Sequence, residues 1–75
     1  MTSHMEAVLK ALEALAAGQA KVRVSLPLLA QRSGLVIADA KEAALELERS
    51  GVLVIRRPLS GGWWYHLPQQ GGEDE

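Results

Sequence analysis

The feature that most constrains this chain is a tight turn, Ser33-Gly34-Leu35, between two segments that are both patterned as helices. Glycine at position 34 suits the positive φ that ends one helix and redirects the chain into the next. A connection this short makes the two helices, expected over residues 26–32 and 37–50, pack against each other at an angle. The turn therefore predicts a close helical pair within the fold.

Both helices have chemical signals at their ends. Ser25 is placed to cap the first helix, and Pro27 lies in its first turn, where proline is tolerated. Gly51 follows the second helix as a terminating residue. The apolar stripe expected to bury this second helix consists of Ala40, Ala43, Ala44 and Leu47.

The flanking segments predict a further helix and a small sheet. Residues 6–17 carry an apolar stripe rich in alanine and leucine, and Gly18 is expected to end that helix. Residues 21–25 alternate polar and apolar side chains, as a short strand does. Residues 52–57 and 63–67 predict a hairpin, with which the short strand can pair.

The chain of 75 residues is expected to hold one domain, over residues 5–67. Residues 1–4 are interpreted as a disordered N-terminus or a cloning scar, and residues 68–75 as a disordered acidic tail. The absence of cysteine excludes disulfides and cysteine-ligated zinc. We expect a cytoplasmic protein, since neither a secretory signal nor a membrane span is visible.

The predicted order is helix, strand, helix, helix, strand, strand, an α+β fold with a three-stranded antiparallel sheet. Residues 28–35 resemble the "hydrophobic-Ala-x-x-Ser/Thr-Gly-Leu" signature of bacterial helix-turn-helix proteins. Residues 45–53 resemble the end of a recognition helix, and residues 56–65 resemble a basic wing. The chain thus resembles the winged-helix superfamily, both its small bacterial transcription regulators and the winged-helix modules of larger DNA-processing proteins.

This resemblance implies binding of double-stranded DNA, with the helix over residues 37–50 in the major groove and the wing on the phosphate backbone. Exposed positions on that helix would include Ile37, Ala38, Asp39 and Lys41. The other candidate contacts, expected to form one weakly basic face with Lys41, are Lys21, Arg23, Gln31, Arg32, Arg56 and Arg57.

The charge pattern supports DNA binding less strongly than the turn supports the fold. The net charge is −1, and only without the three acids at 73–75 do eight bases exceed the remaining six acids. The segment 39–49 holds four acids and two bases, and Val36 stands where a capping serine or threonine is usual. The alternative function is a protein-interaction or oligomerisation module that uses this helix and the aromatic wing.

The aromatic residues are confined to one run, Trp63-Trp64-Tyr65. In a strand Trp63 and Tyr65 point one way and Trp64 the other, so one side is expected to seal the core. The exposed remainder has three interpretations: packing of the wing, a contact with a partner protein, or stacking on a nucleotide. We expect partner contacts at this run, and a homodimer through residues 9–15 is also left open.

Catalytic chemistry has little support in the sequence. The histidines are His4 and His66, and Gly61-Gly62 lies in a hairpin rather than in a strand-to-helix phosphate loop. No spacing of potential metal ligands stands out. We therefore expect a protein that is not an enzyme and needs no cofactor, metal or small-molecule ligand.

Overall fold

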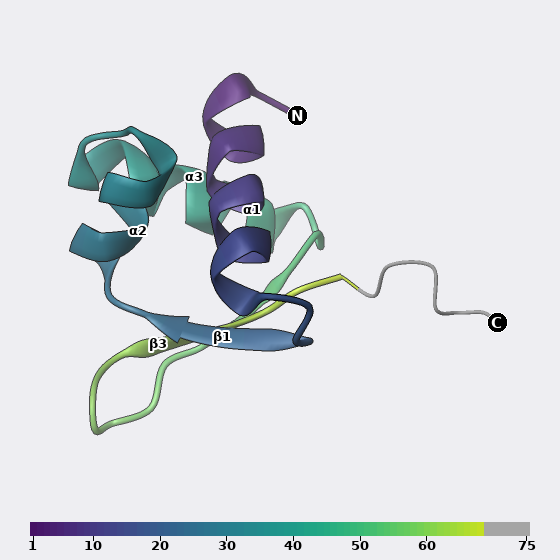
Figure 1. Cartoon of the computed structure of the whole chain (residues 1–75), viewed down its shortest axis with the longest axis vertical. Helices are drawn as coiled ribbons and strands as arrows, with labels where there is room; N and C mark the ends of the chain where they lie inside the picture. Colours follow the sequence, from purple (N-terminus) through teal and green to yellow (C-terminus); the bar gives the residue numbers. More distant parts are fainter. Residues whose placement is uncertain (69–75) are drawn as a thin grey trace, which may run out of the picture.

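The structure, a computed structural model, describes residues 1–68, which form three helices and three strands. The helices pack on one side of the sheet, and the loop that follows β2 projects past the end of β1 (Figure 1). This is the α+β arrangement of a winged helix, in the predicted order. The elements are α1 (Ser3–Ala16), β1 (Lys21–Val24), α2 (Leu26–Ser33), α3 (Ile37–Arg49), β2 (Val54–Arg56) and β3 (Trp63–His66).

The turn between α2 and α3 forms as predicted. Gly34 has φ 74°, and the backbone N–H of Leu35 donates to the carbonyl oxygen of Ala30 at 3.0 Å. At the other end of α2, the Ser25 hydroxyl oxygen accepts a hydrogen bond from the N–H of Leu28 at 3.3 Å. Local capping chemistry therefore sets both ends of α2.

The end of α3 is also glycine-terminated, and this shortens the following strand. Gly51 has φ 78°, and the N–H of Val52 donates to the carbonyl of Leu47 at 3.0 Å. Because Val52 belongs to this helix-ending motif, β2 begins only at Val54. The predicted strand over residues 52–57 is thus too long at both ends.

Helix α1 begins at Ser3, three residues earlier than predicted. The Thr2 hydroxyl oxygen accepts a hydrogen bond from the N–H of Met5 at 3.1 Å and caps the helix. Met5 is buried, so this first turn packs on the core. Ser3 and His4, which the sequence places in a disordered N-terminus or cloning scar, are helical.

At its other end, α1 stops at Ala16, and Ala17 takes a left-handed conformation with φ 52°, one residue before the predicted terminator Gly18. The predicted tail over residues 68–75 lies outside the described residues, except for Pro68.

The sheet has the strand order β1-β3-β2, with both pairings antiparallel. β3 is therefore the central strand, and Tyr65 lies opposite Val22 on one neighbour and Ile55 on the other. The side chains of this row face the helices, with Tyr65 and Ile55 buried. The alternate positions of each strand must point to the opposite side of the sheet.

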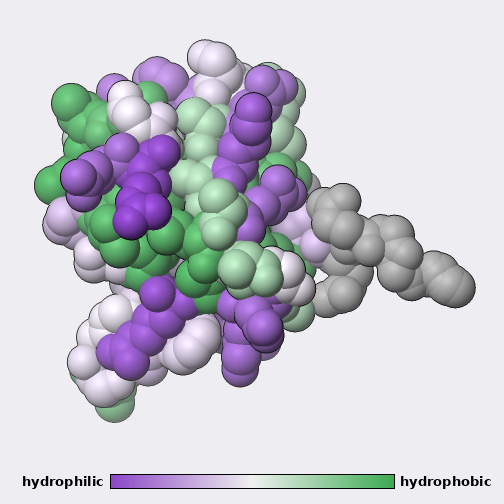
Figure 2. All heavy atoms as spheres, viewed as in Figure 1, coloured by the Kyte–Doolittle hydropathy of each residue, from purple (hydrophilic) through white to green (hydrophobic). Residues whose placement is uncertain are grey.

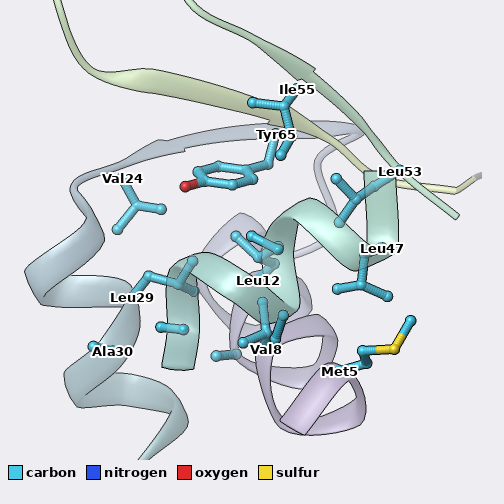
Figure 3. Packing of buried hydrophobic residues seen from close by; sticks show 14 residues of the cluster. Met5, Val8, Leu12, Val24, Leu29, Ala30, Leu47, Leu53, Ile55 and Tyr65 are labelled. Atoms are coloured by element: carbon cyan, nitrogen blue, oxygen red, sulfur yellow. The ribbon is translucent and has the colours of Figure 1, made fainter. Parts of the chain in front are cut away.

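The core lies between the helices and the sheet, and Tyr65 is its largest fully buried side chain. Figure 3 shows the Tyr65 ring reaching from the sheet toward the helices, with Val24 and Ile55 beside it and Leu12 and Leu29 beyond. All three helices contribute to this cluster, so the sheet and the helix-turn-helix share one core.

Candidate nucleic-acid interface

The first half of α3 leaves its predicted contact residues in solvent. Ile37, Ala38, Asp39 and Lys41 are all exposed, as expected from the sequence. Val36, the N-cap, is 65% exposed and makes no side-chain capping bond, and Ile37 is 50% exposed. The first-turn N–H groups of α3 therefore have no side-chain acceptor within the described chain and face solvent.

The second half of α3 is occupied by ion pairs. Glu46 pairs with Arg49 one turn later, at 2.9 Å between carboxylate and guanidinium, and this pair raises the pKa of Arg49. Glu48 pairs with Arg57 at 2.8 Å. Two of the four acids on this helix are thus paired with arginines. The pairing reduces the negative charge that would repel a DNA phosphate near this helix.

The end of α2 adds two polar side chains beside the turn. Gln31 and Arg32 are exposed, and Arg32 lies in the last turn of α2, where a positive charge favours the helix dipole. Ser33 is not available in the same way, because its hydroxyl donates to the carbonyl of Leu29 at 2.8 Å. The helical part of the interface therefore carries Arg32 and Lys41 as its cations.

Arg57 does not project from the wing, which we define as residues 54–66. Its guanidinium donates to both carboxylate oxygens of Glu48, at 2.8 and 3.4 Å, and lies 4.7 Å from the ring centroid of Trp63. The hydrogen bond from Arg57 lowers the pKa of Glu48, and the same bond raises the pKa of Arg57. Arg57 therefore ties the wing to α3.

The remaining predicted cations, Lys21, Arg23 and Arg56, lie on the side of the sheet away from the helices. They belong to what we call the outer sheet face. The sequence predicted one weakly basic face, whereas the register separates these three cations from the polar residues of the helices and from Arg57. The six members of the outer sheet face are Lys21, Arg23, Val54, Arg56, Trp64 and His66.

The side chain of Arg23 also contacts the loop at the tip of the wing. Its Nη2 donates to the carbonyl oxygen of Gly61 at 3.2 Å. A Cβ on Gly62, which has φ 70°, would lie 2.5 Å from the Arg23 Nε, so the guanidinium packs directly on the glycine backbone. Sequence reasoning assigned these glycines only to turn chemistry and missed this close approach.

The three aromatic residues have different surroundings, and the prediction of a partner contact is wrong for Tyr65. Tyr65 is fully buried because it fills the core beneath the sheet. Burial raises its pKa to about 12, and within residues 1–68 its hydroxyl has no hydrogen-bond partner. Trp63 packs partly against this core, with ring centroids 6.3 Å from Tyr65, whereas Trp64 lies on the outer sheet face.

A groove lies between the start of α2 and the wing. Trp63 and Gly62 form its wing side, and Val24 and Pro27 are among the residues opposite. Across residues 1–68, no three potential metal-ligating side chains gather, and each helix is too short or too polar to cross a bilayer.

One of three comparisons with known proteins bears on the fold. Neither a protein-family model nor a curated protein matches the chain. The crystal structure of a candidate DNA-binding protein from Ralstonia eutropha JMP134 is similar, with a TM-score of 0.71 and 20% sequence identity. The similarity covers 92% of this chain and 85% of the other. At this identity the likeness shows the fold, in agreement with the sequence prediction.

Proposed function

We propose that this chain is a winged-helix regulator of transcription that binds double-stranded DNA, with α3 in the major groove. The observation that carries this proposal is the contrast along α3. Its second half is engaged in the core and in ion pairs, while its first half presents Ile37, Ala38 and Lys41 to solvent. The N-terminal half of the recognition helix is the part that contacts base edges in helix-turn-helix complexes.

The exposed side chains suit particular contacts. Lys41 and Arg32 supply charge for phosphates, and Gln31 can donate to a phosphate oxygen. Ile37 and Ala38 offer methyl groups of the kind that contact thymine, and Asp39 can accept a hydrogen bond from cytosine. Few cations are involved, so affinity should depend on these apolar contacts as well as on charge.

The wing's role follows from Arg57. Because its guanidinium pairs with Glu48, we assign Arg57 to orienting the wing rather than to a first phosphate contact. The wing contact then falls on Arg56 and on the tip, where Leu59 is fully exposed.

The test is fluorescence anisotropy with mixed-sequence duplex DNA at several salt concentrations. Lys41→Ala and Arg32→Ala should each weaken binding and reduce the slope of log affinity against log salt by about 1. Lys10→Ala, the same charge change on the exposed side of α1, should have little effect. Absence of salt-sensitive binding, or an equal loss in the Lys10 variant, would refute the proposal.

A second candidate function is a protein-interaction module, and the exposed apolar start of α3 favours it. Val36 and Ile37 are large apolar side chains in solvent next to the acidic Asp39. A second copy of this chain is the partner that can be tested most directly by a measurement in solution. Concentration-dependent sedimentation that Ile37→Ser abolishes would support this function, and a monomer at all concentrations would exclude the homodimer.

A further inference from the structure

The outer sheet face has a regular arrangement, of which the proposed duplex contacts use only Arg56. The register aligns its six side chains in two rows across the three strands. Three are cations, none is acidic, and within residues 1–68 none of the three cations forms a salt bridge. The rows are Lys21, His66, Val54 and Arg23, Trp64, Arg56. In Figure 2 hydrophilic atoms project below the hydrophobic band on this side of the molecule.

An indole ring lies at the centre of this charge. Trp64 is the middle member of its row, with Arg23 on one neighbouring strand and Arg56 on the other. The Nζ of Lys21 is 5.1 Å from the Trp64 ring centroid, within cation–π range. The helices do not cover the ring, and it retains partial exposure. The outer sheet face therefore presents one aromatic ring surrounded by positive charge.

We propose that the outer sheet face binds single-stranded nucleic acid, with one base stacked on Trp64. Aromatic rings that carry a stacked base within a positively charged groove are the common feature of proteins that bind single strands. Arg23 and Arg56 flank the ring on the sides where the neighbouring phosphates of a stacked nucleotide would lie. Lys21 moves from the ring to a phosphate when the base arrives. This proposal does not depend on duplex binding by α3.

The chemistry distinguishes a single strand from other anionic partners. In a duplex the faces of the bases are covered by their neighbours, so only the cations could engage and Trp64 would contribute nothing. An acidic peptide would satisfy the cations but has no planar base to place on the ring. Dependence of affinity on the indole, rather than on charge alone, is therefore the diagnostic property.

The experiment titrates the full chain with a short oligothymidine at low salt and follows tryptophan fluorescence. In a Trp63→Phe background the signal comes from Trp64 alone, and stacking should quench it. Trp64→Ala, followed by anisotropy of a labelled oligonucleotide, should weaken binding roughly 5- to 150-fold, the range measured for loss of one stacked base. Trp64→Phe should retain most of the affinity, which also controls for loss of the fold.

Two controls separate this site from the one on α3. Lys41→Ala should leave oligothymidine binding unchanged while it weakens duplex binding, and Trp64→Ala should do the reverse. Polyglutamate should compete only weakly. Equal affinity of Trp64→Ala and the parent chain for oligothymidine would overturn the proposal, as would quenching by polyglutamate to the same extent.

Discussion

Two arginine–tryptophan pairs lie side by side on the wing and have opposite surroundings. Arg57 stacks on Trp63 on the side of the sheet that faces the helices, and Glu48 of α3 completes that group. Arg56 lies opposite Trp64 on the outer sheet face, where Arg23 and Lys21 surround the ring with further positive charge. The residue types are the same, but one pair joins the wing to the core and the other is presented to solvent.

The difference shows that position in the strand, rather than residue type, assigns the roles. Each arginine and each tryptophan is displaced by a single residue from its counterpart, and a strand reverses side-chain direction at every residue. Structural effects of substitution should therefore follow the inner side, and binding effects the outer side.

The largest contrast is expected between the adjacent residues Tyr65 and Trp64. Tyr65→Ala should lower the free energy of unfolding by about 3–5 kcal/mol, because it empties the centre of the core. Trp64→Ala should cost about 1 kcal/mol, mainly from the contact with Lys21. Urea unfolding followed by circular dichroism measures both, and similar losses would break the distinction between the two sides.

Alkaline pH should affect the inner side selectively. Burial raises the pKa of Tyr65 from 10 to about 12, so the folded chain keeps the phenol proton where the unfolded chain releases it. Stability should be intact below pH 10 and fall as the pH rises from 10 to 12. Thermal unfolding measured across this pH range tests the expectation. In the Tyr65→Phe variant, this pH-dependent loss of stability should be absent.

Tyr65→Phe should also change the free energy of unfolding at neutral pH. The buried hydroxyl has no hydrogen-bond partner in residues 1–68, so its removal relieves an unsatisfied group and leaves the ring in place. The free energy of unfolding should rise by about 1 kcal/mol. A loss of stability instead would mean that the hydroxyl has a partner, such as an ordered water molecule.

The smallest expected effect is the difference in stability between substitutions of Arg57 and of Arg56. The exposed pair of Arg57 and Glu48 should contribute at most about 1 kcal/mol, as a double-mutant cycle with Arg57→Ala and Glu48→Gln would measure. Since Arg57 lowers the pKa of Glu48 below its ordinary 4.5, this contribution is present above pH 4.5 and disappears as the pH falls through the lowered value. Arg56→Ala should leave stability unchanged, and an equal effect of the two arginines would contradict their assignment.

The helix-turn-helix was predictable because its signals act over a few residues. Gly34 and Ser25 take the roles expected of them, since a positive φ and a capping hydroxyl depend on local backbone geometry. The early start of α1 depends on the capping hydroxyl of Thr2, which lies in the segment interpreted as a disordered N-terminus or cloning scar. The exposure of Ile37, Ala38 and Lys41 followed from helical periodicity alone.

The candidate site was predictable only in part. Each predicted DNA contact is exposed, but which of them lie on the outer sheet face depends on which strands pair and in what register. Alternation within each strand was visible in the sequence, whereas the alignment of Arg23, Trp64 and Arg56 in one row was not.

By itself, then, the sequence determined the order of the elements, the turn between α2 and α3, and the parity of each strand residue, because these depend on neighbours along the chain. Only the tertiary structure decided that Arg57 would pair with Glu48, that Tyr65 would lie in the core, and that three cations would gather around Trp64. The physical reason is that burial and charge pairing depend on strands and helices distant in sequence, and packing selects among contacts that the local pattern leaves open.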